Sequence, residues 1–214
     1  MSDIDSYQLS NNVYVTPTPA GAYFCVSGEA DLPSRKILHT LLKKPATLPL
    51  NIDELLSLAG LTNESDLLGL LYRMQTLGWI QGVDFQETAP EGELENVLPE
   101  LLGALSDSGK VLLADEQGFY LSSQGFPHET AEELSALSAD IFSIYDRHQG
   151  LLKNNLSLET SAWAVVDASG NGQIGFWPLW IGGHRFVLII KGVPLLNQSA
   201  LMRLVWVLSI RYGE

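Results

Sequence analysis

VLLADEQGFYLSSQG, residues 111–125, decides the fold of this 214-residue chain. Two apolar runs flank the tetrapeptide DEQG, residues 115–118. In a tight turn, Asp accepts hydrogen bonds from nearby backbone N–H groups and Gly supplies a positive φ. The same Asp-x-x-Gly spacing recurs in DASG, residues 167–170, again between two apolar runs. We therefore predict a β-hairpin at each position.

Two loops that bind ions are excluded in this region. An EF-hand calcium loop needs ligands at alternate positions and a closing Glu, but only Asp115 and Gln117 fit before the second apolar run begins. GALSDSGK, residues 103–110, has one residue too many between its glycines for a phosphate loop, and Val111 stands where Ser or Thr is required.

Helical and strand patterns alternate outward from this stretch. An amphipathic helix is predicted in residues 93–109, and a long helix in residues 127–152. Three apolar runs in residues 161–192 predict strands, and residues 194–214 predict a closing helix. That last helix is apolar nearly all round, which predicts burial on more than one side. The resulting order is α-β-β-α-β-β-β-α.

The segments VLPELLGAL (97–105), VLLADEQGFYLSSQG, ETAEELSALSADIF (129–142) and FVLIIKG (186–192) stand in this order. Together they resemble the Roadblock/dynein light chain family over about residues 93–211. The resemblance implies a profilin-like domain with a five-stranded antiparallel sheet. It also implies a homodimeric platform that binds a small Ras-like GTPase or joins a multi-subunit scaffold, without a catalytic site of its own.

A dimer contact follows from the same resemblance, because the family pairs two protomers through the long helix and the third strand. On this chain the helix 129–148 and the strand 161–167 would supply the contact through five candidates: Leu137, Ile141, Tyr145, Trp163 and Val165. An exposed strand edge is a ready template for such pairing. The alternative is that all five side chains are ordinary core.

Four aromatic residues crowd QIGFWPLWIGGHRF, residues 173–186: Phe176, Trp177, Trp180 and Phe186. Strand alternation places Phe176 and Trp177 on opposite faces. One face must then meet something other than the helix layer, namely the N-terminal module, a partner or solvent. Because Trp is enriched at binding hot spots, we treat the four as a candidate partner surface.

The N-terminal part has a different pattern. Two runs around a Pro/Gly turn in residues 12–27 predict a β-hairpin. Helical spacing follows in residues 34–44, 51–60 and 63–78, and WIQGVDFQ, residues 79–86, predicts a short strand pair. Three helices and a strand resemble a winged helix-turn-helix over residues 33–87.

The acidic, turn-rich residues 84–96 are the best linker candidate. The chain is thus predicted to be a two-domain α+β protein. Residues 1–87 would form a winged-helix-like domain with an N-terminal β-hairpin, and residues 88–214 a Roadblock-like domain.

The net charge of −13 bears on partners. Nucleic-acid binders and polybasic membrane contacts cluster Lys and Arg, whereas here these residues are scattered. The third predicted helix begins with Glu64 and Asp66 and carries Arg73 as its only cation, so nucleic acid is disfavoured. A DNA-binding regulator, with the second domain for dimerisation or sensing, stays the alternative. A small-ligand sensor is a third class, for which the sequence shows no convergent polar set.

Catalytic and metal motifs are absent from the sequence. Cys25 is the single cysteine, so no intramolecular disulfide forms, and its apolar neighbours predict a small buried hydrophobe in a reducing compartment. His39, His128, His148 and His184 lack metal-ligand spacing. No secretory signal or membrane-spanning run is evident. We predict a cytoplasmic protein that is not an enzyme and needs no metal or cofactor.

Overall fold

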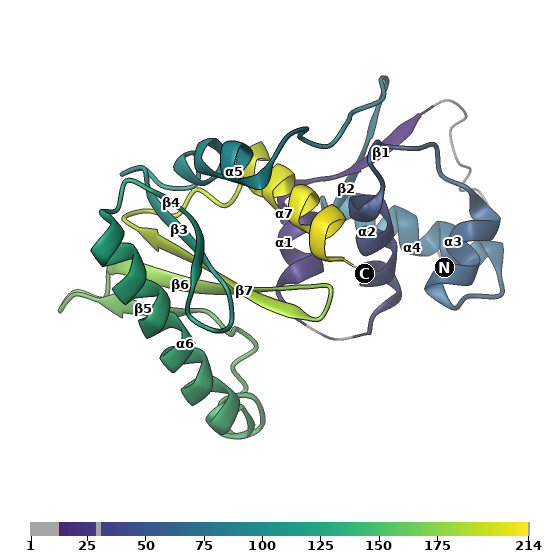
Figure 1. Cartoon of the computed structure of the whole chain (residues 1–214). Helices are drawn as coiled ribbons and strands as arrows, with labels where there is room; N and C mark the ends of the chain where they lie inside the picture. Colours follow the sequence, from purple (N-terminus) through teal and green to yellow (C-terminus); the bar gives the residue numbers. More distant parts are fainter. Residues whose placement is uncertain (1–12, 29–30, 214) are drawn as a thin grey trace.

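The computed structural model describes residues 13–28 and 31–213 (Figure 1). A twisted sheet lies at one end of the molecule, and a group of short helices lies at the other. The C-terminal elements occur in the predicted order: α5 (Leu94–Gly103), β3 (Lys110–Ala114), β4 (Tyr120–Gln124), α6 (His128–Gly150), a π-helical segment (Leu151–Asn155), β5 (Trp163–Val166), β6 (Gly172–Ile181), β7 (His184–Lys191) and α7 (Ser199–Tyr212).

The five strands form one antiparallel sheet in the order β4-β3-β7-β6-β5. The central strand β7 pairs with β3 through Ile190 and Val111, and with β6 through Ile190 and Gly175. The predicted five-stranded antiparallel sheet is therefore confirmed. Strands β4 and β5 are its two edges.

Helices cover both faces of this sheet. Successive side chains of a strand point to opposite faces, so Leu112 packs in the cluster under α6 while Leu113 packs in the larger core on the other side. The α6 side also buries Phe142 and Phe176. The other face meets α5 and α7, whose buried side chains belong to the larger core.

The two Asp-x-x-Gly segments form hairpin turns, as predicted. Oδ1 of Asp115 accepts hydrogen bonds from the backbone N–H groups of Gln117 and Phe119, both at 2.9 Å, and Gly118 has φ +88°. Oδ1 of Asp167 accepts from the N–H groups of Ser169 and Asn171 in the same way. Hydrogen bonds from the Asn171 backbone and side chain are the main cause that lowers the pKa of Asp167.

Asp115→Ala is expected to lower the free energy of unfolding by about 1 kcal/mol, because two backbone N–H groups lose their acceptor. Asp115→Asn keeps an acceptor oxygen and should cost less. Urea unfolding measures both, with the exposed neighbour Glu116→Ala as the control. If Asp115→Asn left stability intact and abolished binding of a partner, the turn would have a role beyond folding.

The N-terminal helices occupy the predicted segments: α2 (Pro33–Lys43), α3 (Ile52–Ala59) and α4 (Glu64–Thr76). The Asn51 side chain caps α3 by accepting from the Glu54 N–H at 3.2 Å, and Gly60 ends the helix at φ +67°. Asn63 caps α4 by accepting from the Ser65 N–H at 2.9 Å. The helical spacing therefore located these helices correctly.

The predicted N-terminal hairpin is wrong. Residues Tyr14–Pro17 form strand β1, but the second run forms helix α1 (Pro19–Val26). Thr18 caps this helix by accepting from the Gly21 N–H at 3.1 Å, and Pro19 occupies its first turn, where the missing N–H of proline costs nothing. The Thr-Pro start signal outweighed the strand-like composition of the run YFCV.

The strand pair predicted in residues 79–86 is also corrected. Only β2 (Ile80–Val83) is a strand, and it pairs antiparallel with β1, with Tyr14 opposite Val83. Beyond it, Thr88 makes an isolated bridge to Ala46. Strand β2 therefore pairs with β1, which lies much earlier in the chain, and not with a strand next to it in the sequence.

Helix α7 joins the two halves of the molecule, since it lies between the sheet and the N-terminal helices (Figure 1). It packs against α1 and α2 as well as α5, and the Trp206 indole N–H donates to the Lys44 carbonyl oxygen at 2.8 Å. One hydrophobic core runs from α1 through α7 to the sheet. These contacts explain the predicted burial of α7 on several sides. The domain boundary after residue 87 stays a prediction.

Candidate interaction surface

Strand β5 is an edge strand that is exposed along its whole length. It pairs with β6 on one side, and no strand of the described sheet pairs with its other side. Its apolar side chains include Trp163, Val165 and Val166, and more than half of the Val165 surface is exposed. Edge strands normally carry charged residues or are covered by another element, because an uncovered edge can pair with a strand of another chain.

The register shows which face these side chains use. Trp163 lies opposite Phe176, and Val165 lies opposite Ile174. Residues directly opposite in an antiparallel pair share a face, and Phe176 and Ile174 pack in the cluster under α6. Trp163 and Val165 therefore lie on the α6 face, yet both are exposed, so α6 does not cover the β5 end of this face.

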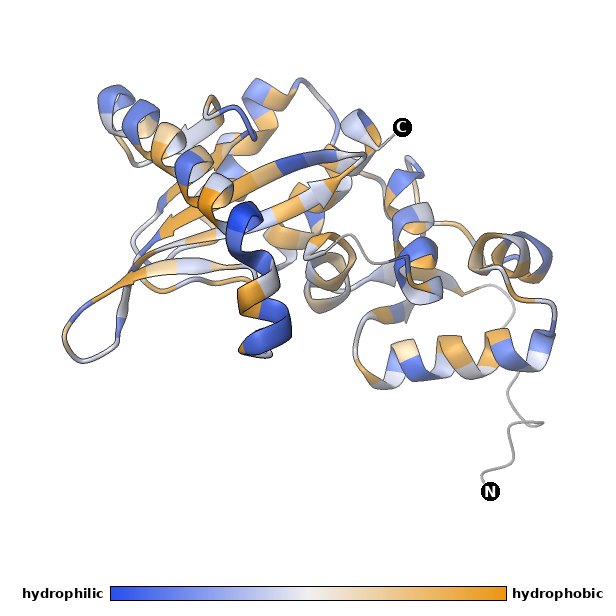
Figure 2. Cartoon of the chain, turned by 90° about the horizontal axis from the view of Figure 1, so that it is seen from below, coloured by the Kyte–Doolittle hydropathy of each residue, from blue (hydrophilic) through white to orange (hydrophobic). Residues whose placement is uncertain are grey.

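Helix α6 carries a second exposed apolar feature. Leu137 and Ile144 lie on α6, and Leu151 begins the π-helical segment that follows it. The three residues follow one another at intervals of seven, and each is 44% to 50% exposed. That interval keeps side chains on one face of a helix. Figure 2 shows apolar segments alternating with polar ones along α6. We call Leu137, Ile144, Leu151 and the two β5 residues Trp163 and Val165 the β5/α6 surface.

The predicted dimer residues divide between this surface and the core. Leu137, Trp163 and Val165 are exposed, and Ile141 is half-buried against the cluster under α6. Tyr145 is buried beside Phe142, with ring centroids 6.2 Å apart, so the core explanation holds for it. The predicted contact did not include Ile144 and Leu151, although their seven-residue spacing from Leu137 was a usable signal.

The four residues of the predicted partner surface in residues 173–186 differ in burial. Phe176 lies in the cluster under α6, and Phe186 packs against Tyr212 on the opposite side, with ring centroids 5.0 Å apart. Trp177 packs against the larger core, and Trp180 is half-buried beside a cavity. Neither Phe176 nor Phe186 offers a surface to a partner, because helices cover both faces of the sheet at these positions.

An ion pair fixes α6 against the end of the sheet. Nη1 of Arg185 lies 2.9 Å and 2.8 Å from the two carboxylate oxygens of Asp146, and the guanidinium lies over the Phe142 ring. Because the Arg185 side chain is largely buried, salt screens this ion pair less than it would screen a pair on the surface. The contact therefore holds the exposed stripe of α6 in a fixed position relative to β5.

The structure also assembles polar groups that the sequence separates. The Tyr120 hydroxyl lies 2.7 Å from Nδ1 of His128, and Nε2 of His128 lies 3.4 Å from Glu132. His128 and Glu132 are exposed at the start of α6, so water competes for both. This chain of contacts orders the first turn of the helix.

Cys25 is buried, as predicted, and burial raises the pKa of its thiol to about 12. The thiolate is therefore scarce at neutral pH. Within residues 13–28 and 31–213, His, Cys, Asp and Glu do not gather into a metal-binding group. In the same part of the chain, no helix combines the length and apolar composition that crossing a membrane requires.

No protein-family model matches the sequence, and neither does any curated protein. Among solved structures, the chain is similar to the Roadblock/LC7 domain from Streptomyces avermitilis, at 12% sequence identity and a TM-score of 0.35, over 56% of this chain and 93% of that one. It is also similar to Myxococcus xanthus MglB, at 20% identity and a TM-score of 0.32, over 56% of this chain and 89% of that one.

The fold assignment rests on the element order and the strand order described above. Residues 94–212 show the α-β-β-α-β-β-β-α order and the five-stranded antiparallel sheet that the sequence predicts. The three N-terminal helices and strand β2 occupy the predicted segments, and their assignment as a winged helix stays a prediction.

Proposed function

We propose that this chain is a non-enzymatic regulatory or scaffold protein that works as a homodimeric platform for a protein partner. The observation that carries the proposal is strand β5, an unpaired edge of the described sheet whose apolar side chains are exposed. A second copy offers the same edge, so two β5 strands would pair antiparallel about a two-fold axis and join two sheets.

The stripe on α6 supports the same pairing. A two-fold axis beside β5 places the α6 helices of both copies on the same side of the joined sheet. Leu137, Ile144 and Leu151 would then lose contact with water against the partner copy. Trp163 and Val165 point to this side as well, and burying them completes the layer over β5.

The partner of this platform is proposed to be a small Ras-like GTPase, or a subunit of a larger complex. The proposal follows from the resemblance of residues 93–211 to the Roadblock family, and it concerns binding without turnover on this chain. The net charge of −13 is compatible with a basic or neutral partner surface.

DNA binding by the N-terminal helices is the weaker alternative. Glu64 and Asp66 lie in the first turn of α4, the turn that would approach base edges in a winged helix. Two carboxylates at that position repel the phosphate backbone. The N-terminal helices are therefore better suited to binding protein.

A pull-down with the purified chain tests the GTPase proposal. A lysate of the source organism is divided into one arm with a non-hydrolysable GTP analogue and one with GDP, and retained proteins are identified by mass spectrometry. We expect a small P-loop GTPase that is retained differently in the two arms. Its absence from both arms would overturn the GTPase proposal, and salt-sensitive binding in a gel-shift assay would support the DNA alternative.

A further inference from the structure

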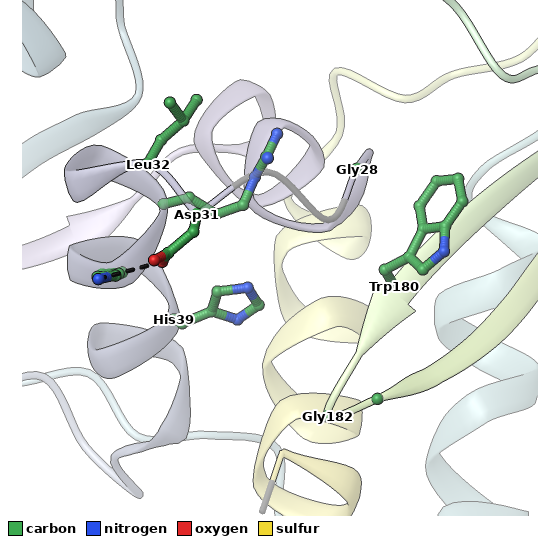
Figure 3. Close-up of a pocket in the computed structure, with 9 residues that line it drawn as sticks. Gly28, Asp31, Leu32, His39, Trp180 and Gly182 are labelled. Atoms are coloured by element: carbon green, nitrogen blue, oxygen red, sulfur yellow. Dashed lines mark ion pairs between the residues drawn. The ribbon is translucent and has the colours of Figure 1, made fainter. Parts of the chain in front are cut away.

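A cavity of about 300 Å³ lies where helix α2 faces the turn between β6 and β7. Figure 3 shows His39 projecting from α2 on one side of it and Trp180 standing on β6 on the other. Its volume is at the low end for ligand pockets, so it suits a small molecule. The cavity therefore lies between the N-terminal helices and the sheet.

Three nitrogen-bearing side chains line the α2 side: Arg35, Lys36 and His39. They occupy positions i, i+1 and i+4 of one helix. Among the described residues that line the cavity, Asp31 is the one carboxylate, and it pairs with Lys36 at 3.1 Å near the surface, where such a pair is weak. In a chain with a net charge of −13, Arg35 and Lys36 bring two positive charges to one wall of this cavity.

The Arg35 guanidinium is held in place by the protein. Its Nε and Nη2 donate to the Phe24 carbonyl oxygen at 3.2 Å and 3.1 Å, and it lies over the Phe24 ring. The Arg35 residue is 7% exposed. Because the side chain is fixed before a ligand arrives, binding would not have to immobilise it.

The opposite wall is apolar and open. The Trp180 indole supplies a flat surface on which a planar group can stack. At Gly183, in the adjacent turn, an added Cβ would meet nothing within 4 Å, so the backbone there is accessible from the cavity.

We propose that this cavity binds a small organic anion, with its charged group among Arg35, Lys36 and His39 and its flat apolar body against Trp180. The ligand would contact α2 and the β6–β7 hairpin together. It would therefore stabilise the docking of the N-terminal helices on the sheet. This site is independent of the β5/α6 surface.

The His39 ring is sensitive to the charges around the cavity. Burial lowers the pKa of His39, and the nearby charges of Lys43 and Arg35 lower it further. Among the described residues, the charged groups that line the cavity are Arg35, Lys36 and Asp31, and Lys43 acts on the ring from the next turn of α2. A bound anion offsets this repulsion, so the His39 ring protons are a local reporter of occupancy.

The test is a titration of the full chain at low ionic strength, followed by calorimetry and by NMR of the His39 ring and the Trp180 indole. The probes are phenyl phosphate, benzoate, inorganic phosphate and the cation benzylamine. We expect phenyl phosphate or benzoate to saturate with a dissociation constant of roughly 1 mM or below, and to shift both reporters. Tighter binding of one of the two identifies the anionic group.

Two lysines provide a matched pair of variants. Lys36 and Lys44 are 42% and 40% exposed and pair with Asp31 and Glu54 at 3.1 Å and 3.2 Å, but only Lys36 lines this cavity. Lys36→Gln should weaken the tighter probe at least about fivefold, because a charge-assisted contact is lost, whereas Lys44→Gln should leave it unchanged.

Trp180→Leu tests how much the Trp180 side of the cavity contributes to binding, independently of the cations on α2. It should weaken the aromatic anions and leave inorganic phosphate unaffected, because only the stacking surface is lost. Absence of saturable binding by both aromatic anions would overturn the proposal. Equal weakening by Lys36→Gln and Lys44→Gln, or equal affinity for benzylamine, would overturn it too, since either result means that the charges at the cavity do not select the ligand.

Discussion

Val165→Glu is expected to separate the proposed dimer while leaving each protomer folded. Val165 is 54% exposed in the single chain, so a carboxylate at this position stays hydrated in the protomer. In a β5–β5 pair, the same carboxylate and its copy would lose water without a partner. We expect the dimer dissociation constant to rise at least about 100-fold, which corresponds to about 3 kcal/mol.

Sedimentation at a series of protein concentrations measures this change. Val193→Glu is the matched control, because Val193 is 57% exposed and lies after β7, outside the β5/α6 surface. The control should retain the wild-type dissociation constant. If wild type is monomeric at high concentration, or if both variants weaken association equally, then β5 is not the contact.

Gly182→Ala is expected to be the most destabilising single change in the β6–β7 turn. Gly182 has φ +58°, and an added Cβ would overlap the backbone carbonyl group of Tyr212 at the end of α7. Relief requires the turn and the helix to move apart. We expect the free energy of unfolding to fall by about 3 kcal/mol or more, from strain at positive φ and from overpacking.

Gly183→Ala is the internal control in the same turn. Gly183 has φ +79°, but its added Cβ meets nothing within 4 Å, so only the conformational cost of about 1 kcal/mol applies. Urea unfolding of both variants isolates the contact between the turn and α7. Equal destabilisation would mean that the turn does not pack on Tyr212 in solution.

Local sequence signals located most elements of the fold. The helical spacing of apolar residues marked the helices, and the Asx turns at Asp115 and Asp167 marked the hairpins. These signals act within a few residues of chain. The start of α1 is marked by a local signal as well. Thr18 and Pro19 specify a helix there, although the apolar composition of the following residues suggests a strand.

Local signals could not show which of the predicted site residues are buried and which are exposed. Alternation places Phe176 and Trp177 on opposite faces of β6, but it does not say that helices cover both faces there. Tyr145 and Leu137 belong to the same helix, yet one is core and the other is exposed. The difference arises from where α6 crosses the sheet, which depends on contacts between distant segments.

By itself, the sequence determined the order of the elements in residues 94–212, the Asp-x-x-Gly turns and the caps of α3 and α4, because each depends on neighbouring residues. The tertiary structure alone decided that β1 pairs with β2, that α7 is buried between the sheet and the N-terminal helices, and that β5 is left uncovered. It also placed the cations of α2 opposite Trp180. These features join residues far apart in the chain, and their energy comes from packing surfaces that no local pattern specifies.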